Sequence, residues 1–231
     1  MALSKKTSGV VLLLLVLILT GCGGEMVTDL YVQDIYEIAE GVEEPLFTTA
    51  TIALETFGEE YDDEMIELIE ANFRQATNFR TRSQEYSTYL LADVKVPILD
   101  FEDSLDLWNF EDLLGIVVLT MEDGSLAFGV GLNSEKFGEL STYFGDEYWG
   151  PLSIKDFTIS VKLINDLRDP VLVSLQSVYV NQVPLAYDEI YELQRRDILD
   201  IQIADVLRDY AFEEGIVFFG ILEDWATQIT E

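Results

Sequence analysis

The chain has 231 residues, of which 44 are acidic and 13 basic, and it contains no histidine and one cysteine. The lack of histidine excludes an imidazole base or metal ligand, and a single cysteine excludes an intrachain disulfide and a cysteine-cluster zinc site. The net charge of −31 argues against nucleic-acid binding, because phosphate groups would be repelled. A hydrophobic fraction of 49% with 12% aromatic residues is enough for the core of a folded domain.

The N-terminus has the layout of an export signal. Lys5 and Lys6 precede the unbroken apolar run 10–19, and the small residues Thr20 and Gly21 follow directly before Cys22. This order predicts a signal peptide over residues 1–21 that is cleaved before Cys22. The alternative is an uncleaved anchor, but the run is shorter than the roughly 20 apolar residues of a membrane span.

Leu19-Thr20-Gly21-Cys22 resembles the lipobox of bacterial lipoproteins. The resemblance implies a diacylglycerol on the sulfur of Cys22 and an acyl chain, such as palmitate, on its amino terminus. These chains would anchor the protein to the membrane. Residues 22–30 are then a lipidated tether, on which the acidic domain stands off the bilayer. Under the sorting rule of enteric-type bacteria, Gly23 in place of aspartate favours the outer membrane, on its periplasmic or surface side, over the inner membrane.

The first half of the mature chain predicts two helices and two strands. Residues 32–39 show helical spacing closed by Gly41, and residues 46–54 read as a strand. Residues 61–76 read as a helix whose first turn holds Asp62, Asp63 and Glu64. We interpret those acids as a charged first turn rather than a metal site. Residues 86–98 alternate with period two and predict a long strand.

The middle of the chain predicts a hairpin and a helix. The acidic stretch 100–112 reads as a loop or short helix over the core. The apolar runs 114–121 and 126–132 flank Asp123-Gly124, a strong hairpin signal. Asn133 and Ser134 suit the cap of a short helix. One side of that helix carries Phe137, Leu140 and Phe144.

The last third predicts strands 157–163 and 171–180, paired antiparallel, then a helix over 201–212 and a strand over 216–222. No repeat or linker divides residues 31–231, so they form one domain. Hairpins and single helices alternate without regular βαβ units. This predicts the α+β class, a mostly antiparallel sheet with a few packed helices, and a continuous sandwich-like sheet is the nearest alternative.

The layout of the ectodomain resembles a family of small lipoproteins of unknown function found in bacteria, phages and prophages. That resemblance assigns no catalytic residue. The segments that carry it are Leu30-Tyr31-Val32-Gln33-Asp34-Ile35, Thr48-Thr49-Ala50-Thr51-Ile52, Val94-Lys95-Val96-Pro97-Ile98, Ile159-Ser160-Val161-Lys162-Leu163-Ile164-Asn165-Asp166 and Val178-Tyr179-Val180-Asn181.

No catalytic pattern stands out from the sequence. Asp100, Asp103 and Asp106 read as a solvated loop, although Glu111 and Asp112 beside Trp108 could line a sugar cleft. Residues 129–131 form a Gly-Val-Gly inside a strand, without the third glycine and helix of a phosphate loop. We therefore expect no catalytic residue, no metal and no cofactor, and a protein that is not an enzyme.

Three functions remain open. The first, which we favour, is an envelope lipoprotein that docks another envelope protein; a phage-linked form of it would block receptors. The second is a carrier for an apolar ligand, held between sheet and helices in a cavity lined by residues such as Leu90, Val94 and Phe128. The third is a carboxylate-based hydrolase. The aromatic candidates for a docking surface are Trp108, Tyr143, Phe144, Tyr148 and Trp149, with the core as the alternative place for the last four.

Overall fold

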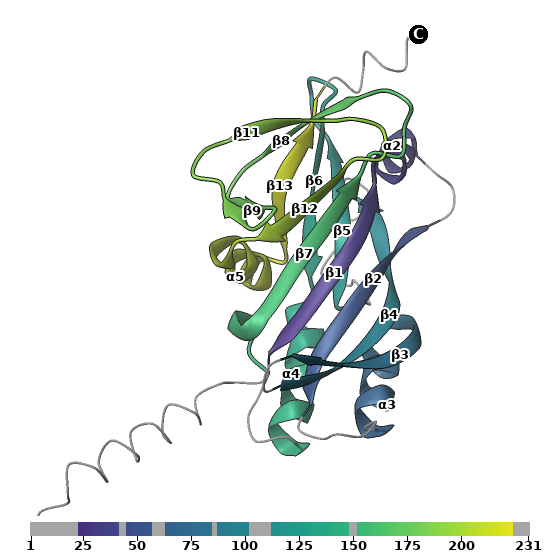
Figure 1. The fold of residues 1–231 in the computed structure, drawn as a ribbon, viewed down its shortest axis with the longest axis vertical. Coiled ribbons are helices and arrows are strands. Elements are labelled where there is room, and N and C mark those ends of the chain that lie inside the picture. The colour runs from purple at the N-terminus through teal and green to yellow at the C-terminus, as the bar shows by residue number, and fades with distance from the viewer. Residues whose placement is uncertain are drawn as a thin grey trace, which may run out of the picture.

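The computed structural model describes residues 23–41, 45–56, 63–84, 87–101, 112–147 and 152–223. Thirteen strands in these residues form one sheet that curls strongly on itself (Figure 1). The expected α+β class is therefore wrong, because the protein is mostly β. The alternative of one continuous sheet is closer to the structure.

The helices and strands alternate irregularly along the chain. The helices are α2 (Val32–Glu40), α3 (Asp63–Asn72), α4 (Ser134–Glu147), α5 (Asp205–Glu214) and the 3-10 helix η2 (Ile154–Asp156). The strands are β1 (Gly24–Tyr31), β2 (Leu46–Thr56), β3 (Arg74–Gln84), β4 (Ser87–Asp100), β5 (Leu114–Thr120), β6 (Leu126–Leu132), β7 (Phe157–Ile164), β8 (Val171–Leu175), β9 (Val178–Val180), β10 (Val183–Pro184), β11 (Glu189–Leu193), β12 (Ile198–Ile203) and β13 (Ile216–Leu222).

The strand order across the sheet is β10-β9-β12-β7-β1-β2-β4-β5-β6-β13-β8-β11, and β3 pairs with β4 beside this path. Neighbouring strands are antiparallel except for the pairs β1–β7 and β4–β5. The two ends of this path, β10 and β11, are consecutive in sequence and are joined by residues 185–188. The sheet therefore begins and ends at neighbouring points of the chain.

A single cluster of buried apolar side chains fills the inside of the curl. Helix α2 lies at one end and contacts β1, β4, β5 and β6, while α3 and α4 lie at the opposite end (Figure 1). Ile35 of α2 and Leu140 of α4 are fully buried in this cluster. The helices thus close the two ends of a core that the sheet surrounds.

Several elements with strong local patterns are confirmed. The predicted strand 86–98 is β4, and its even-numbered side chains from Leu90 to Ile98 are buried. The hairpin around Asp123-Gly124 is β5–β6. Helix 32–39 is α2, and Gly41 ends it with φ of 80°, a left-handed conformation that glycine adopts without steric cost. Asn133 caps α4 by accepting a hydrogen bond from the Lys136 N–H at 3.0 Å.

The expected tether is largely a strand. Residues 24–31 form β1, which lies between β7 and β2 near the middle of the sheet. Met26, Thr28 and Leu30 are fully buried and alternate with more exposed residues. The period of two is present in the sequence, but the expected signal peptide directly before it favours the interpretation as a tether.

Two further strands, β3 and β12, differ from the prediction, which assigned part of each to a helix and left the rest unassigned. The helix expected over 61–76 covers only Asp63–Asn72 in the structure, and the polar residues Arg74–Gln84 form β3 along β4. The helix expected over 201–212 begins only at Asp205, because Leu199, Ile201 and Ile203 alternate inward as part of β12. Pairing with distant strands decides the conformation of these segments, and local spacing does not.

The predicted antiparallel pairing of 157–163 with 171–180 is also wrong. β7 pairs in parallel with β1 and antiparallel with β12, whereas β8 pairs with β11 and β13. The buried amide of Asn165 stabilises the turn between β7 and β8. Its Nδ2 donates to the carbonyl oxygens of Asp169 and Leu193, at 3.0 and 2.8 Å. The turn therefore sends the chain to the other half of the sheet.

Candidate functional site

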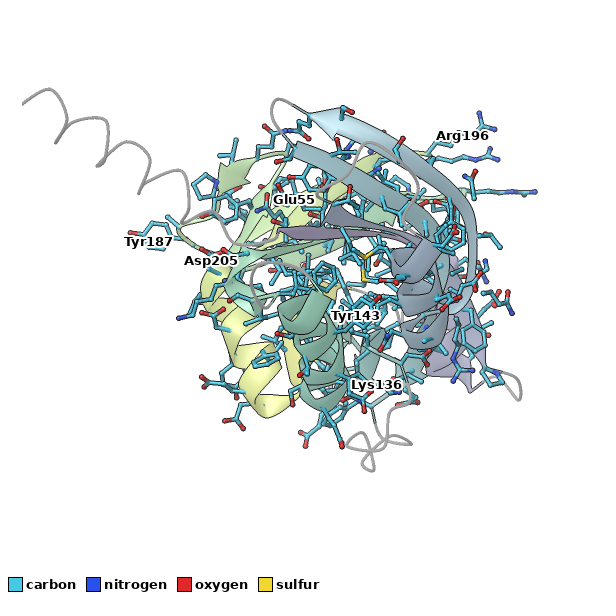
Figure 2. All side chains as sticks on the ribbon, turned by 90° about the horizontal axis from the view of Figure 1, so that it is seen from below. Glu55, Lys136, Tyr143, Tyr187, Arg196 and Asp205 are labelled. Atoms are coloured by element: carbon cyan, nitrogen blue, oxygen red, sulfur yellow. The ribbon has the colours of Figure 1, made fainter. Side chains whose placement is uncertain are left out.

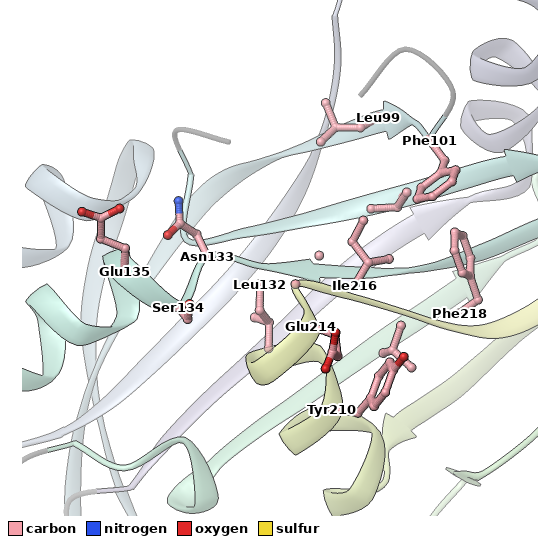
Figure 3. Close-up of a pocket in the computed structure, with 14 residues that line it drawn as sticks. Leu99, Phe101, Leu132, Asn133, Ser134, Glu135, Tyr210, Glu214, Ile216 and Phe218 are labelled. Atoms are coloured by element: carbon pink, nitrogen blue, oxygen red, sulfur yellow. The ribbon is translucent and has the colours of Figure 1, made fainter. Parts of the chain in front are cut away.

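A cavity of about 700 Å³ lies beside β5, β6 and β13 (Figure 3). Val117 of β5 and Ile216 and Phe218 of β13 line it, and all three belong to the sheet face opposite the main core. This follows from strand alternation, since Ile116, Val118, Val217 and Phe219 point into the core. The cavity is thus a second apolar space on the outer face of the sheet.

Two glycines on β6 shape this space, Gly129 by allowing the close approach of β13 and Gly131 by leaving room in the lining. Gly129 lies opposite Val117 and Phe218, and Gly131 lies opposite Ile216, so both are on the cavity side of the strand. A Cβ at Gly129 would come within 2.0 Å of the Val217 carbonyl oxygen, so close approach of β13 requires glycine there. A Cβ at Gly131 would meet Val117 Cγ2 at 3.4 Å, an ordinary contact. Gly131 therefore leaves space that a larger side chain would fill.

The end of β4 supplies an aromatic and aliphatic wall. Leu99 and Phe101 line the cavity, and the ring of Phe101 packs edge-on against the ring of Phe218 with centroids 5.6 Å apart. Such an arrangement is favourable for aromatic pairs and fixes both rings. The wall and floor of the cavity are consequently apolar.

Polar groups occur where the helices meet the cavity. Ser134 and Glu135 begin α4, and Tyr210 and Glu214 belong to α5. In Figure 3 the side chains of Tyr210 and Glu214 lie beside β13. Among the described lining residues there are two carboxylates and no lysine or arginine. The described rim therefore carries the negative charges of Glu135 and Glu214 and no positively charged side chain.

A buried arginine holds α5 in place beside the cavity. The side chain of Arg208 is 7% exposed, and its guanidinium bonds the carboxylates of Asp205 and Asp209 at 3.0 and 2.9 Å. It also donates to the carbonyl oxygen of Phe157 at 3.3 Å, which ties the helix to the start of β7. Arg208 thereby positions the helix that bears Tyr210 and Glu214.

Two of the five aromatic residues expected on a docking surface lie within the described residues, and both pack toward the core. Phe144 is fully buried, and Tyr143 is half-buried and packed against the core. Figure 2 shows Tyr143 among the helices at this end of the molecule. The reason is that α4 turns its apolar side, with Phe137, toward the core. Trp108, Tyr148, Trp149 and Cys22, the residue expected to be acylated, lie outside the described residues.

The residues expected to line a cavity for an apolar ligand do not line the cavity that the structure shows. Leu90, Val94 and Phe128 are all buried in the main core, where Phe128 packs edge-on against Phe219 with centroids 5.4 Å apart. The cavity found here lies on the other face of β6. Its sequence signal was the pair of glycines two residues apart, which removes two side chains from one face of a strand.

The acidic candidates for catalysis have structural partners where they are described. The buried carboxylate of Asp112 accepts two hydrogen bonds from Arg74 Nε, at 2.7 and 2.8 Å. Asp63 and Glu64 are exposed in the first turn of α3, as expected for a charged first turn. Asp62, Asp103, Asp106 and Glu111 lie outside the described residues. Within the described ranges, no three acidic, histidine or cysteine residues gather as a metal site.

Comparison with known proteins identifies a family but no function. A search of the described helices for one long and apolar enough to cross a membrane finds none. No curated protein and no solved structure matches the chain. The family described as Domain of unknown function (DUF7424) matches residues 24–224. That match includes every strand of the sheet and the whole cavity, and the chain therefore belongs to this family.

Proposed function

We propose that the protein is a membrane-anchored envelope protein that binds an uncharged or cationic apolar ligand in the cavity beside β5, β6 and β13. The single observation that carries this proposal is the cavity itself, an apolar space of about 700 Å³ on the outer face of the sheet. Binding pockets for small molecules fall in the same size range, about 300–1,000 Å³, and are mostly apolar with a few polar groups.

The charge of the rim narrows the class of ligand. Glu135 and Glu214 border the cavity, and the described lining offers no basic side chain to pair with a ligand carboxylate. The net charge of −31 adds a long-range field of the same sign. A fatty acid would be disfavoured at neutral pH, whereas an amine or an uncharged molecule would not.

The attachment of the protein to a membrane is also part of this proposal. The lipobox-like segment ending at Cys22 supports acylation there, and Gly23 in place of aspartate supports attachment to the outer membrane, on its periplasmic or surface side. The protein then acts by binding rather than by catalysis. The phage-linked form remains an extension of this proposal, supported by the resemblance of the ectodomain to lipoproteins of bacteria and phages.

A fluorescence displacement experiment tests the ligand class. The described apolar core runs from Met26 to Leu222, so the chain from Gly23 onward contains all of it and is used for the experiment. The neutral dye N-phenyl-1-naphthylamine should become fluorescent on binding this chain. Dodecylamine should displace the dye at about tenfold lower concentration than dodecanoate, a difference of about 1.4 kcal/mol. Equal displacement, or preference for dodecanoate, would contradict the proposed charge selectivity.

A matched pair of glycine variants locates the binding site. Gly131→Leu places a side chain in the cavity and should abolish dye binding. Gly138→Leu is the control, because a Cβ at Gly138 meets no atom within 4 Å among the described residues. Retained dye binding in folded Gly131→Leu would show that the dye binds elsewhere.

A second candidate function is docking of a partner protein through the free edge of β11. Among the described strands this one pairs only with β8, and its Ile190 is 61% exposed, close in sequence to Tyr187 at 85%. An unpaired edge with exposed apolar side chains favours the addition of a strand from a partner. Crosslinking in the host membrane through a photoreactive residue at position 190 should capture one partner, and Ile190→Lys should abolish capture.

A further inference from the structure

The folded domain begins at the residue that follows the proposed anchor. The backbone N–H of Gly23 donates to the Glu55 carboxylate at 3.0 Å, and the Gly23 carbonyl oxygen accepts from the Glu55 N–H at 3.0 Å. The next residue, Gly24, pairs with Leu54 of β2 and Phe157 of β7. Cys22 is therefore followed by residues that are fixed by hydrogen bonds, with no free linker between.

The first residues of β1 cannot detach from the sheet to lengthen the link to Cys22. β1 is an interior strand, in register with all of β7 from Gly24 to Tyr31 on one side and with five residues of β2 on the other. Its side chains Met26 and Leu30 are fully buried. Releasing residues 24–26 to lengthen a tether would open the middle of the sheet and expose its core.

The distance from Cys22 to the start of β1 is no longer than the thickness of the lipid headgroup layer. An extended residue spans at most about 3.6 Å, so Gly24 lies within about 7 Å of the Cα of Cys22. The lipid headgroups form a layer about 5–7 Å thick outside the hydrocarbon. If the acyl chains on Cys22 enter the hydrocarbon, the start of β1 is at the level of the headgroups.

We infer that the end of the sheet around Gly24 rests directly on the lipid headgroups, and that the domain is held there in one orientation. This inference rests on the proposed anchor at Cys22 and replaces the expected stand-off tether. The membrane-facing end includes η2, whose Asp156 carbonyl oxygen lies beside Gly23, and the neighbouring side chain of Glu55. Helices α3 and α4 lie at the same end of the molecule (Figure 1). The occupant of this surface is the bilayer, brought there by the acyl chains rather than by protein charge.

The parallel pairing of β1 with β7 defines the outward end. Both strands run away from Gly24 and Phe157, so the turn after Ile164 lies at the far end, about 23 Å along the strands. The β11–β12 turn lies beside it, because the Arg196 N–H donates to the Asn165 carbonyl oxygen. Arg195 in that turn is exposed and forms no ion pair within the described residues.

Two labelled variants of the full-length acylated chain test the orientation. Acylation consumes the thiol of Cys22, so an introduced cysteine is the single reactive thiol. Lys155→Cys places a fluorophore on η2 at the membrane-facing end, and Arg195→Cys places it at the outward end; each replaces one exposed basic residue. The proteins are reconstituted in phosphatidylcholine vesicles containing a lipid with a nitroxide quencher on its headgroup.

The label at position 155 should be quenched several-fold more strongly than the label at position 195. Inserting ten Gly and Ser residues between Cys22 and Gly23 adds a flexible linker of about 16–19 Å and should remove most of the difference. Equal quenching of the two labels, or a difference that survives the linker, would overturn the inference.

Intact mass spectrometry of the same samples separates this inference from the proposals on which it depends. Acyl chains on Cys22 with equal quenching would mean that the anchor exists and the orientation is wrong. A chain without acyl groups would overturn the anchor and the inference together. Neither outcome affects dye binding in the cavity, which is measured on the chain without its anchor.

Discussion

Thr28 and Thr48 are both buried threonines of adjacent strands, but within the described part of the chain only the Thr48 hydroxyl has a hydrogen-bond partner. The hydroxyl of Thr48 donates to the carbonyl oxygen of Asp29, whereas the hydroxyl of Thr28 is buried without a hydrogen bond among the described residues. A buried polar group costs free energy when it lacks a partner. The two positions therefore predict opposite responses to the same substitution.

Thr28→Val should raise the free energy of unfolding by about 1 kcal/mol, because valine keeps the shape and removes the unpaired hydroxyl. Thr48→Val should lower it by about 1 kcal/mol, because the hydrogen bond to Asp29 is lost. Urea denaturation of both variants measures the two changes. Destabilisation of Thr28→Val would mean that its hydroxyl has a partner, such as a bound water.

Asn165 should be the most sensitive polar residue of the β7–β8 turn. It is fully buried, its Nδ2 donates to two carbonyl oxygens, and its Oδ1 accepts from the Leu167 N–H at 3.0 Å. Asn165→Ala should cost about 3 kcal/mol of unfolding free energy. Asn165→Asp should cost more at neutral pH, because a carboxylate would face two carbonyl oxygens. Gln176→Ala, at an exposed position, is the control and should change little.

Replacement of Arg208 should affect stability and the cavity together. Arg208→Ala removes the bonds to Asp205, Asp209 and Phe157, and we expect a loss of about 2 kcal/mol in the free energy of unfolding. Because α5 carries Tyr210 and Glu214, dye affinity should also fall. Chemical denaturation and dye titration measure both effects. Arg195→Ala removes an exposed arginine from the opposite end and should leave both unchanged.

The free energy of unfolding of the wild type, measured relative to that of the Asp34→Asn variant, should rise as the solution is acidified. Burial raises the pKa of Asp34 above its ordinary value of 3.8, and the charges of Asp166 and Glu37 raise it further. The folded state then binds the proton more tightly than the unfolded state, so the ionised carboxylate destabilises the fold above the raised pKa. This penalty is lost as the pH falls through the raised pKa toward 3.8.

Asp34→Asn should therefore be more stable than the wild type at pH 7, and its advantage should disappear near pH 3.5. Thermal unfolding at both pH values checks the sign. A constant difference between the two proteins would show that the substitution acts through packing rather than through ionisation.

The sequence correctly predicted those helices and strands whose conformation is determined by neighbouring residues. The alternation in β4 and the Asp123-Gly124 turn act over a few residues, so their patterns were sufficient. β12 was assigned wrongly because pairing with the distant β7 outweighed its helical spacing. β1 has the alternation of a strand, but its position next to the expected signal peptide favours a tether. The polar sequence of β3 carries no strand pattern; it is held along β4, where the Arg80 guanidinium bonds Asp93 at 2.9 Å.

The candidate site was less predictable than the fold. The aromatic residues proposed for binding included Phe144, which a helical pattern equally assigns to the core, where it lies. The cavity depends on the absence of side chains at Gly129 and Gly131 and on the approach of β13, which follows them by more than eighty residues. The glycine pair is visible in the sequence, but no local pattern shows that β13 packs against it.

The position of β1 between β2 and β7 also has a consequence for the timing of folding. The first strand to be synthesised cannot complete its pairing until Phe157–Ile164 has been made, because that segment forms one of its two neighbours. Sheets that depend on such distant pairing form slowly. The sheet of a growing chain with this topology therefore stays incomplete at least until about two thirds of the sequence, up to Ile164, has been synthesised.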